Sequence, residues 1–190
     1  GAVDCWGSND YGQADDQPGP YGPYVPDTNP PETTIDSGPH GPTMSTVAFF
    51  TFSANEAGST LECRLDTGSW EACTSPKEYT GLSHGLHAFY ARATDAAGNT
   101  DPTPAGFAWY IDLVAPETTI NAWPPNPTAQ NSGAFAYASS EGGSESFFDC
   151  QLDSTNWVFC DGGSYGYSNL ADGNHTFRVR AMDGVGNMDK

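Results

Sequence analysis

Basic residues are scarce in this chain of 190 residues. It has six Lys and Arg against 24 Asp and Glu, so its formal net charge is −18 with neutral histidines. Proteins that bind a nucleic-acid backbone or an anionic membrane surface do so through clustered Lys and Arg. The charge balance therefore excludes nucleic acid as a partner and disfavours docking on a membrane surface.

Aliphatic residues are also few, and no long apolar run occurs. Leu, Ile, Val and Phe together make up 27 of the 190 residues, a proportion that at this charge would by itself favour disorder. The chain also has ten Phe, nine Tyr and five Trp, and each aromatic ring buries a large area. No stretch approaches the roughly 20 apolar residues that span a bilayer. We therefore expect an aromatic core and no membrane span.

Catalytic motifs are missing as well. The chain has four His and contains no P-loop, no H-E-x-x-H and no dinucleotide fingerprint. Residues 162–166 fit the string G-x-S-x-G, but that motif needs a strand, a sharp elbow and a helix. Here the string follows Cys160 in a glycine-rich loop. We predict that the protein is not an enzyme and has no catalytic residues.

What the chain does contain is an internal repeat. Residues 31–35 read Pro-Glu-Thr-Thr-Ile and recur at residues 116–120, an offset of 116 − 31 = 85. The offset then grows to 87 and to 88, as expected when short insertions fall in loops. The later matches pair Cys63 with Cys150, Leu65 with Leu152, Asp66 with Asp153, Trp70 with Trp157, Cys73 with Cys160, His87 with His175, Asp95 with Asp183, Asn99 with Asn187 and Asp101 with Asp189. The repeat predicts two homologous domains.

Each copy is composed of segments typical of short β-strands. In the first copy these segments, rich in β-branched and aromatic residues and bounded by Gly, Ser, Asn, Asp and Pro, are residues 47–52, 61–65, 87–93 and 107–111. No window of a dozen residues has helical periodicity. Residues 65–70 and 152–157 have the turn chemistry of hairpins. We predict an all-β fold of two tandem antiparallel β-sandwich domains with Greek-key connections.

Several motifs resemble a known family. Pro-Glu-Thr-Thr-Ile, Glu-Cys-Arg-Leu-Asp and the run Gly-Leu-His-Ala-Phe-Tyr-Ala-Arg-Ala, with their second copies, resemble bacterial Ig-like repeats of secreted and cell-surface proteins over residues 31–190. The N-terminal Cys-Trp-Gly-Ser-Asn-Asp-Tyr-Gly-Gln resembles one blade segment of an RCC1-like propeller, which cannot fold alone. The Ig-like resemblance implies the fold but not the function, because such modules serve as stalks, adhesin arms and enzyme appendages.

These features divide the chain into four parts. Residues 1–13 form the N-terminal segment with the RCC1-like motif, and residues 14–30 form a linker rich in Pro and Gly. Residues 31–114 form the first Ig-like domain and residues 115–190 the second. The linker composition favours an extended spacer.

Four of the five cysteines occur as two pairs with equal spacing. Cys63 and Cys73 flank the first predicted hairpin, and Cys150 and Cys160 flank the second. Two disulfides are the favoured interpretation, each contributing roughly 2 to 3 kcal/mol by the chain-entropy model. The alternative is buried, reduced thiols. Cys5 belongs to neither pair, and it is a candidate either for an intermolecular disulfide or for an inert buried thiol.

The two copies do not end alike. After Asp101 the first copy continues into the aromatic run at residues 107–111, whereas only Lys190 follows Asp189 in the second. We therefore expect the second domain to lack its last strand. A missing strand leaves a row of unpaired backbone groups along one sheet edge, which a strand from another chain can complete.

The N-terminal segment is the candidate donor of that strand. Ala2, Val3, Cys5 and Trp6 combine β-forming side chains with a position ahead of a stiff linker. Donation from one molecule to the next is a contact that does not close on itself and so builds a filament. The alternative is a clipped or frayed C-terminus that receives no donor.

Calcium is the one metal that the sequence suggests. Both copies carry a loop with two carboxylates and an amide, formed by Asp95, Asn99, Asp101, Asp183, Asn187 and Asp189. Calcium takes six to eight oxygen ligands of this kind. Asp36, Asp112 and Glu117, near the domain junctions, are candidates for further ligands. Asp and Asn beside Gly also cap the backbone of a tight turn, so a structural role for these residues is the alternative.

Together these features predict a secreted, extracellular or cell-surface protein without enzymatic activity. The favoured function is that of a structural subunit whose partner is itself, in a homopolymer assembled head to tail. One alternative is an adhesin that binds cell-surface glycans or other matrix proteins, with Trp123 as a candidate contact. Two further alternatives are a stalk module of a larger surface protein and an appendage of a larger enzyme.

Overall fold

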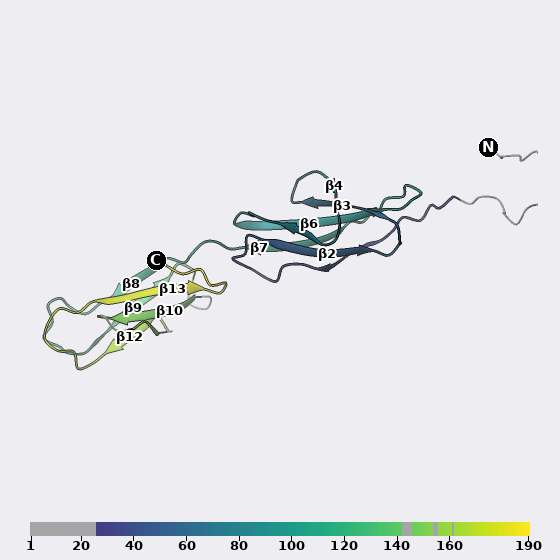
Figure 1. Cartoon of the computed structure of the whole chain (residues 1–190). Coiled ribbons are helices and arrows are strands. Elements are labelled where there is room, and N and C mark those ends of the chain that lie inside the picture. The colour runs from purple at the N-terminus through teal and green to yellow at the C-terminus, as the bar shows by residue number, and fades with distance from the viewer. Residues whose placement is uncertain (1–25, 142–145, 154–155, 161) are drawn as a thin grey trace, which may run out of the picture.

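The computed structural model describes residues 26–141, 146–153, 156–160 and 162–190. In these ranges the chain forms thirteen strands, grouped into two sandwiches that follow one another along the chain (Figure 1). No described segment is a helix that could cross a membrane. The candidate donor residues Ala2, Val3, Cys5 and Trp6, and with them the RCC1-like segment, lie outside the described residues.

Domain 1 is a sandwich of a three-stranded and a four-stranded sheet. Its strands are β1 (Thr33–Ser37), β2 (Ala48–Ala54), β3 (Thr60–Leu65), β4 (Glu71–Ala72), β5 (Lys77–Tyr79), β6 (Gly85–Thr94) and β7 (Ala105–Ile111). The sheet orders are β1-β2-β5 and β4-β3-β6-β7, with every pair antiparallel. The four strands predicted for this copy are confirmed as β2, β3, β6 and β7.

Among the described residues, domain 2 repeats this arrangement with six strands where domain 1 has seven. Its strands are β8 (Thr118–Ala122), β9 (Gly133–Ser139), β10 (Ser146–Leu152), β11 (Val158–Phe159), β12 (Ser164–Tyr167) and β13 (Phe177–Asp183). The sheet orders β12-β9-β8 and β11-β10-β13 match those of domain 1 strand for strand, up to the counterpart of β6. The predicted all-β, tandem Ig-like fold is confirmed, and within the described ranges nothing corresponds to β7.

The core of domain 1 is an aromatic stack between the two sheets. Strand β6 alternates buried and half-buried residues, as expected for a strand with one face in the core. Phe89 of β6 stacks on Phe50 of β2 with ring centroids 4.2 Å apart. Phe107 and Trp109 of β7 meet Phe50 edge-on at 5.9 and 5.2 Å. Phe50 and Phe89 are both 0% exposed because β7 covers them.

The same stack exists in domain 2, but it is less covered. Phe135 stacks on Phe177 at 4.1 Å, and these residues occupy the repeat positions of Phe50 and Phe89. Both rings are only half-buried. The fully enclosed part of this core lies at the other side, around Tyr137, Phe148 and Cys150.

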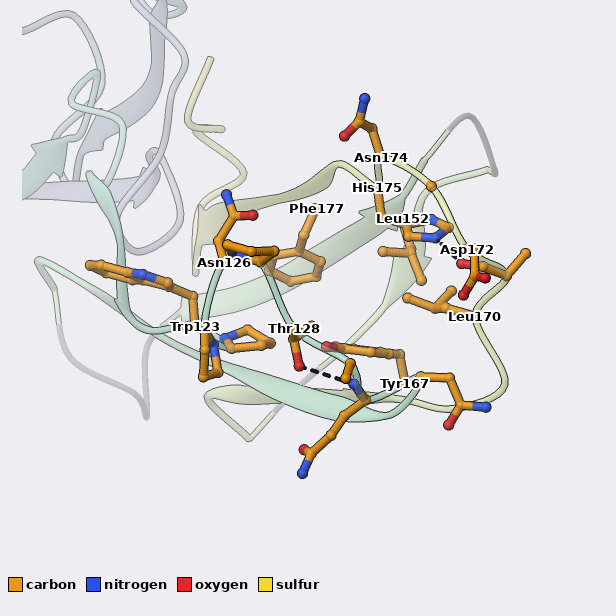
Figure 2. A pocket seen from close by; sticks show the side chains of 18 of the residues that line it. Trp123, Asn126, Thr128, Leu152, Tyr167, Leu170, Asp172, Asn174, His175 and Phe177 are labelled. Atoms are coloured by element: carbon orange, nitrogen blue, oxygen red, sulfur yellow. Dashed lines mark hydrogen bonds between the residues drawn. The ribbon is translucent and has the colours of Figure 1, made fainter.

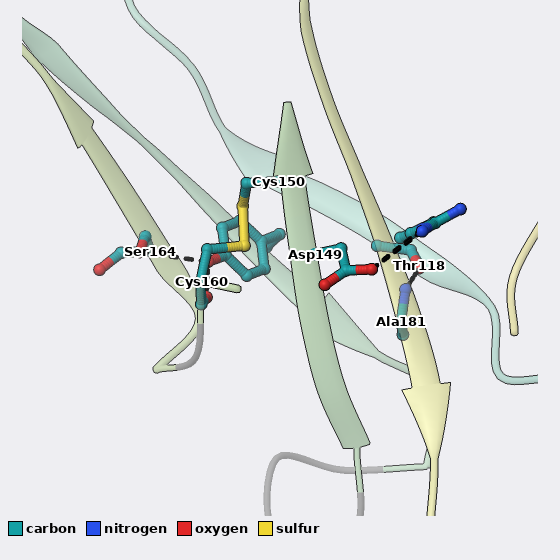
Figure 3. The surroundings of a disulfide bond; sticks show 8 residues. Thr118, Asp149, Cys150, Cys160, Ser164 and Ala181 are labelled. Atoms are coloured by element: carbon teal, nitrogen blue, oxygen red, sulfur yellow. Dashed lines mark hydrogen bonds and ion pairs between the residues drawn. A yellow bond between two sulfur atoms is a disulfide. The ribbon is translucent and has the colours of Figure 1, made fainter. Parts of the chain in front are cut away.

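Both predicted disulfides are present. Cys63 bonds Cys73 and Cys150 bonds Cys160, so the alternative of reduced thiols is wrong. Figure 3 shows the second disulfide beside β10. The Tyr137 hydroxyl donates to the backbone carbonyl of Cys160. Each bridge thus fastens the short outer strand, β4 or β11, to the core.

The repeated tryptophans contact arginine side chains on the outward faces of the larger sheets. Trp70 lies between the guanidinium groups of Arg64 and Arg92, at 4.9 and 4.3 Å. In domain 2 Arg180 lies 4.3 Å from the ring of Trp157. Cation–π contacts of this kind are typically worth about 0.5 to 1 kcal/mol at exposed sites. Three of the few cations are therefore used inside the fold.

The difference in burial predicts a difference in mutational cost. Phe50→Ala should lower the free energy of unfolding of domain 1 by about 3 to 5 kcal/mol, the usual cost of emptying a filled aromatic site. The matched change Phe135→Ala should cost domain 2 about half as much, because its ring is already half-exposed. Urea unfolding of the intact chain followed by tryptophan fluorescence measures both changes, and equal losses would contradict this account.

Candidate functional site

The free edge of β13 is the first element of the site. In domain 1 the equivalent edge, on β6, is occupied by β7 over the paired residues from Gly85↔Ile111 to Ala91↔Ala105. In domain 2, β13 pairs with β10 on one side, and it is the last strand of its sheet among the described residues. Thr118 Oγ1 and the N–H of Asp189 bond the outer backbone groups of Ala181, so the part of this edge without a neighbouring strand in the described residues runs over Phe177–Val179.

A groove of about 590 Å³ lies beside this edge (Figure 2). Its floor consists of Phe135, Tyr167, Leu170 and Phe177, and its rim is the loop of residues 123–131. We call this feature the open groove. The counterparts of the floor residues in domain 1, at Phe50, Tyr79, Leu82 and Phe89, all belong to the core cluster that includes Trp109 and Ile111 of β7. The open groove is thus the place that β7 fills in domain 1.

A histidine marks the mouth of the groove. In domain 1 the ring of His87 lies 5.5 Å from that of Trp109, and His87 is 7% exposed. His175 holds the same repeat position in domain 2 and is exposed, since no tryptophan lies over it in the described part of the chain. This difference again traces to β7, which has no counterpart among the described residues of domain 2.

Each of these histidines is fixed by an aspartate of the preceding hairpin. His87 Nδ1 lies 2.9 Å from Asp66 Oδ2, and His175 Nδ1 lies 2.9 Å from Asp153 Oδ2. Both aspartates have positive φ, at 52° and 58°, which Asp tolerates in a tight turn. The other ring nitrogen of each histidine is held by a backbone carbonyl, that of Ser83 or Ala171. The repeated His therefore has a structural role in the described structure.

These contacts shift the pKa values of the pair. Burial favours neutral His87, but the Ser83 carbonyl and the Asp66 carboxylate outweigh it and raise the pKa of His87 above its usual value. The Ala171 carbonyl and Asp153 raise the pKa of His175 in the same way. The hydrogen bond from His175 in turn lowers the pKa of Asp153.

The predicted calcium loops form tight turns. Asp95 Oδ1 accepts from the backbone N–H of Asn99 at 2.8 Å, and Oδ2 accepts from the Asn99 side chain at 2.8 Å. Asp183 and Asn187 make the same two contacts at 2.8 and 2.7 Å. These contacts are the ones expected if the Asp and Asn residues cap the backbone of a tight turn. They lower the pKa of Asp95, mainly through the Asn99 amide, and that of Asp183, where they outweigh burial.

Two of the predicted calcium ligands are used elsewhere. The carboxylate of Asp101 accepts from the backbone N–H of Thr33 at 3.0 Å, and that of Asp189 accepts from Thr118 at 2.9 Å. Each one ties the end of its repeat to the first strand. The predicted set of six residues is therefore not brought together as ligand groups, because these two carboxylates cap backbone groups instead.

The structure assembles two other acidic groups. Carboxylate oxygens of Asp27, Glu56 and Asp95 lie within 4.8 Å of one another at domain 1, and the same holds for a second group, Asp112, Glu141 and Asp183, at domain 2. Of these residues the sequence analysis named Asp112 as a further candidate ligand, and it did not assign Asp27, Glu56 and Glu141 to any site. Their common offset of 85, in 112 − 27 and 141 − 56, was the signal that could have identified them.

The segment entering each domain is fastened at the same place. The Asn99 side chain donates to the backbone carbonyl of Asp27, and the Asn187 side chain donates to that of Asp112, both at 3.1 Å. Asp112 follows β7 directly, so this bond joins domain 2 to the end of domain 1. At the entry to domain 1, Asp27 occupies the position that Asp112 occupies at the entry to domain 2.

Comparison with known proteins yields structures rather than families. No family model matches the chain, and neither does any curated protein. Fibronectin(III)-like modules of Clostridium thermocellum CbhA match 84% of this chain and 90% of theirs at 18% identity, with a TM-score of 0.40.

Two larger bacterial proteins also resemble it. A 1.5-MDa bacterial ice-binding adhesin matches 85% of this chain and 62% of the solved chain at 8% identity and a TM-score of 0.47. Dimeric latent PorU of Porphyromonas gingivalis matches 92% of this chain and 21% of the solved chain at 13% identity and a TM-score of 0.36. The assignment of the fold rests on the strand order given above.

The His–Asp pairs predict a pH dependence. A histidine whose pKa is raised by folding stabilises the protein below its unfolded pKa near 6.5, and this stabilisation is lost as the pH rises through the folded pKa. Asp153 acts oppositely, because its contribution is lost as the pH falls through its lowered pKa. We expect the melting temperature to be highest between about pH 5 and 6 and to fall by about 2 to 4 °C by pH 8.

Histidine variants distinguish the contribution of the His–Asp pairs to this pH dependence from that of the overall charge. In His87→Gln the decline between pH 6 and pH 8 should become smaller. In the control His40→Gln, at an exposed residue, it should persist. Calorimetric scans across this range measure both, and an unchanged slope in His87→Gln would contradict the role assigned to the pair.

Proposed function

We propose that this chain is a non-enzymatic extracellular structural protein, a subunit of a fibre that assembles head to tail. In each contact the open groove of one molecule receives a β-strand from the N-terminal segment of the next. The observation that carries the proposal is the pair of matched edges in one chain. Strand β7 covers the aromatic stack on β6, whereas the equivalent stack beside β13 is half-exposed.

Two properties support an extracellular location. The chain carries two disulfides, which persist in oxidising compartments and are rare in the cytosol. Its surface charge of −18 keeps exposed faces apart and so favours association through specific contacts only.

The geometry of the chain suits head-to-tail contacts. The loops that line the open groove, residues 123–131 and 170–175, lie at the end of domain 2 away from domain 1. The chain enters domain 1 at the opposite end of the molecule (Figure 1). The entry of the chain into domain 1 and the open groove therefore lie at the two ends of the described structure, which suits addition of successive molecules along one direction.

A second candidate function uses the same groove differently. Trp123 at its rim is 66% exposed, and Phe135 and Tyr167 add aromatic surface. Exposed aromatic rings beside polar groups suit a sugar ligand, as in a glycan-binding adhesin or a stalk module of a larger surface protein. Binding of the intact chain to a glycan array, lost in Trp123→Ala, would favour this function over assembly.

Assembly is testable with the chain itself. Light scattering after size exclusion should show a mass that rises with concentration. A variant that carries a second copy of residues 102–112 after Lys190 provides its own closing strand, and it should remain a monomer. The same extension with Trp109 and Ile111 of the copy replaced by Asp is the matched control and should still assemble. A purely monomeric intact chain at all concentrations would contradict the proposal.

Calcium binding at the two acidic groups is a further part of the proposal. Each group offers three carboxylates and lies beside a backbone carbonyl, that of Asp27 or Asp112, and calcium prefers such oxygens. An ion there would brace the entry of each domain.

Thermal melts test this part. Millimolar calcium should raise the melting temperature of the intact chain relative to excess chelator, because binding to the folded state alone stabilises it. Glu56→Gln with Glu141→Gln should remove the difference. The control Glu78→Gln, on β5 and outside both groups, should keep it. Identical melts with calcium and with chelator would leave these residues with the turn role only.

A further inference from the structure

The entry points of the two domains extend the repeat towards the N-terminus. Asp27 holds the repeat position of Asp112, since 112 − 27 = 85. The structure supports this alignment twice: both backbone carbonyls accept from the equivalent asparagine at 3.1 Å, and both carboxylates join the equivalent Glu and Asp. The residues before Asp27 therefore stand in the frame of β7, which ends immediately before Asp112.

We infer that residues 20–26 are the strand that enters the open groove of a second copy of this chain. In the repeat frame Tyr24 corresponds to Trp109, the residue whose ring covers Phe50 and His87 in domain 1. Pro26 corresponds to Ile111, which is 0% exposed there. This inference rests on the proposed function and replaces Ala2, Val3, Cys5 and Trp6 as its donor residues.

The register of the complex follows from domain 1. Trp109 pairs with His87, so Tyr24 should pair with His175. The side chain of Tyr24 would then lie over the exposed aromatic floor beside Phe135 and Phe177. Asp27 follows the strand into the next molecule, as Asp112 follows β7 into domain 2.

The rim of the open groove shares a side-chain contact with the loop that bonds β7 in domain 1. In domain 1, Thr43 bonds the end of β7 on the side away from β6: its N–H donates to the carbonyl of Tyr110 at 3.1 Å, and its carbonyl accepts from Asp112 at 2.9 Å. Thr128 is its counterpart, at the same offset of 85. Thr43 Oγ1 accepts from the N–H of Ser45, and Thr128 Oγ1 accepts from that of Gln130, both at 3.1 Å (Figure 2). The loop around Thr128 therefore repeats this side-chain contact of the loop that holds β7.

The occupant must come from another molecule. Residues 20–26 join domain 1 directly, and seven extended residues span at most about 25 Å. The open groove lies at the far end of domain 2, with all of domain 1 between them (Figure 1).

The prolines of the segment set its expected strength. Pro20, Pro23 and Pro26 lack the N–H that a ladder uses, and proline is tolerated chiefly on edge strands. In the register of β7 only Pro23 faces away from the neighbouring strand, whereas Pro20 and Pro26 align with Ala105 and Ile111, whose backbone faces β6, so these two positions lose a ladder hydrogen bond. Binding should therefore be weaker than that of the β7 sequence, which keeps every N–H.

Disulfide trapping tests the register in the full chain. In a Cys5→Ser background, Tyr24→Cys with His175→Cys places two thiols on facing residues of an antiparallel pair, where cross-strand disulfides can form. Mild oxidation should give a ladder of covalent oligomers on a non-reducing gel. The control Val25→Cys with His175→Cys puts the first thiol on the opposite face of the strand and should give about tenfold less.

A second pair of cysteine substitutions distinguishes residues 20–26 from the N-terminal segment as the donor strand. Val3→Cys with His175→Cys should give no ladder if residues 20–26 fill the groove. A ladder from this pair, with none from Tyr24→Cys, would overturn the inference and leave the proposed function standing. Absence of every ladder, together with a monomeric wild-type chain, would remove both.

Peptide competition repeats the test without altering His175. Peptides of residues 103–113, 18–28 and 1–9 are added to the wild-type chain, and the loss of oligomers is measured by light scattering. The expected order of potency is residues 103–113, then 18–28, then 1–9. Equal or greater potency of the peptide of residues 1–9 over that of residues 18–28 would overturn the inference, even if the first peptide still dissolves the oligomers.

Discussion

The cover that β7 provides for the aromatic pair of Phe50 and Phe89 is the contact on which domain 1 depends. The chain has few aliphatic residues, so its cores must be closed by rings packed on rings. Phe107 and Trp109 approach Phe50 from the strand that completes the sheet. One strand thus supplies both the last row of backbone hydrogen bonds and the last wall of the core, and its removal affects both at once.

The described residues of domain 2 show the same aromatic pair without a counterpart of β7. The stack of Phe135 on Phe177 keeps its geometry, with centroids 4.1 Å apart, because its two strands are held by their own neighbours and by the Cys150–Cys160 bridge. What changes is exposure, along the floor of the open groove. The disulfides and the Asp–His hairpin contacts therefore hold the sandwich in shape, while the closing strand decides whether it is sealed.

The sequence predicted the fold well because the repeat compares the chain with itself. The equal spacing of the cysteines in two copies leaves few alternatives. It therefore predicted the matched positions of Cys63 and Cys150 and the strands around them. The acidic groups were harder to predict. Asp101 and Asp95 lie in one loop, yet one carboxylate turns to Thr33 and the other to Asn99. Side-chain direction at a turn depends on which backbone N–H is near, and that is set by tertiary packing. Glu56 joins Asp95 from a distant loop, which spacing alone does not show.

The path of β7 also has a mechanical consequence. It runs the length of its sheet and passes straight through Asp112 into the next domain. Tension applied to the two ends of the molecule would pull this strand along its own axis, against β6. Its hydrogen bonds lie across that axis, so they share the load and would break together rather than one after another. A tether built in this way resists stretching best in the direction in which it is longest.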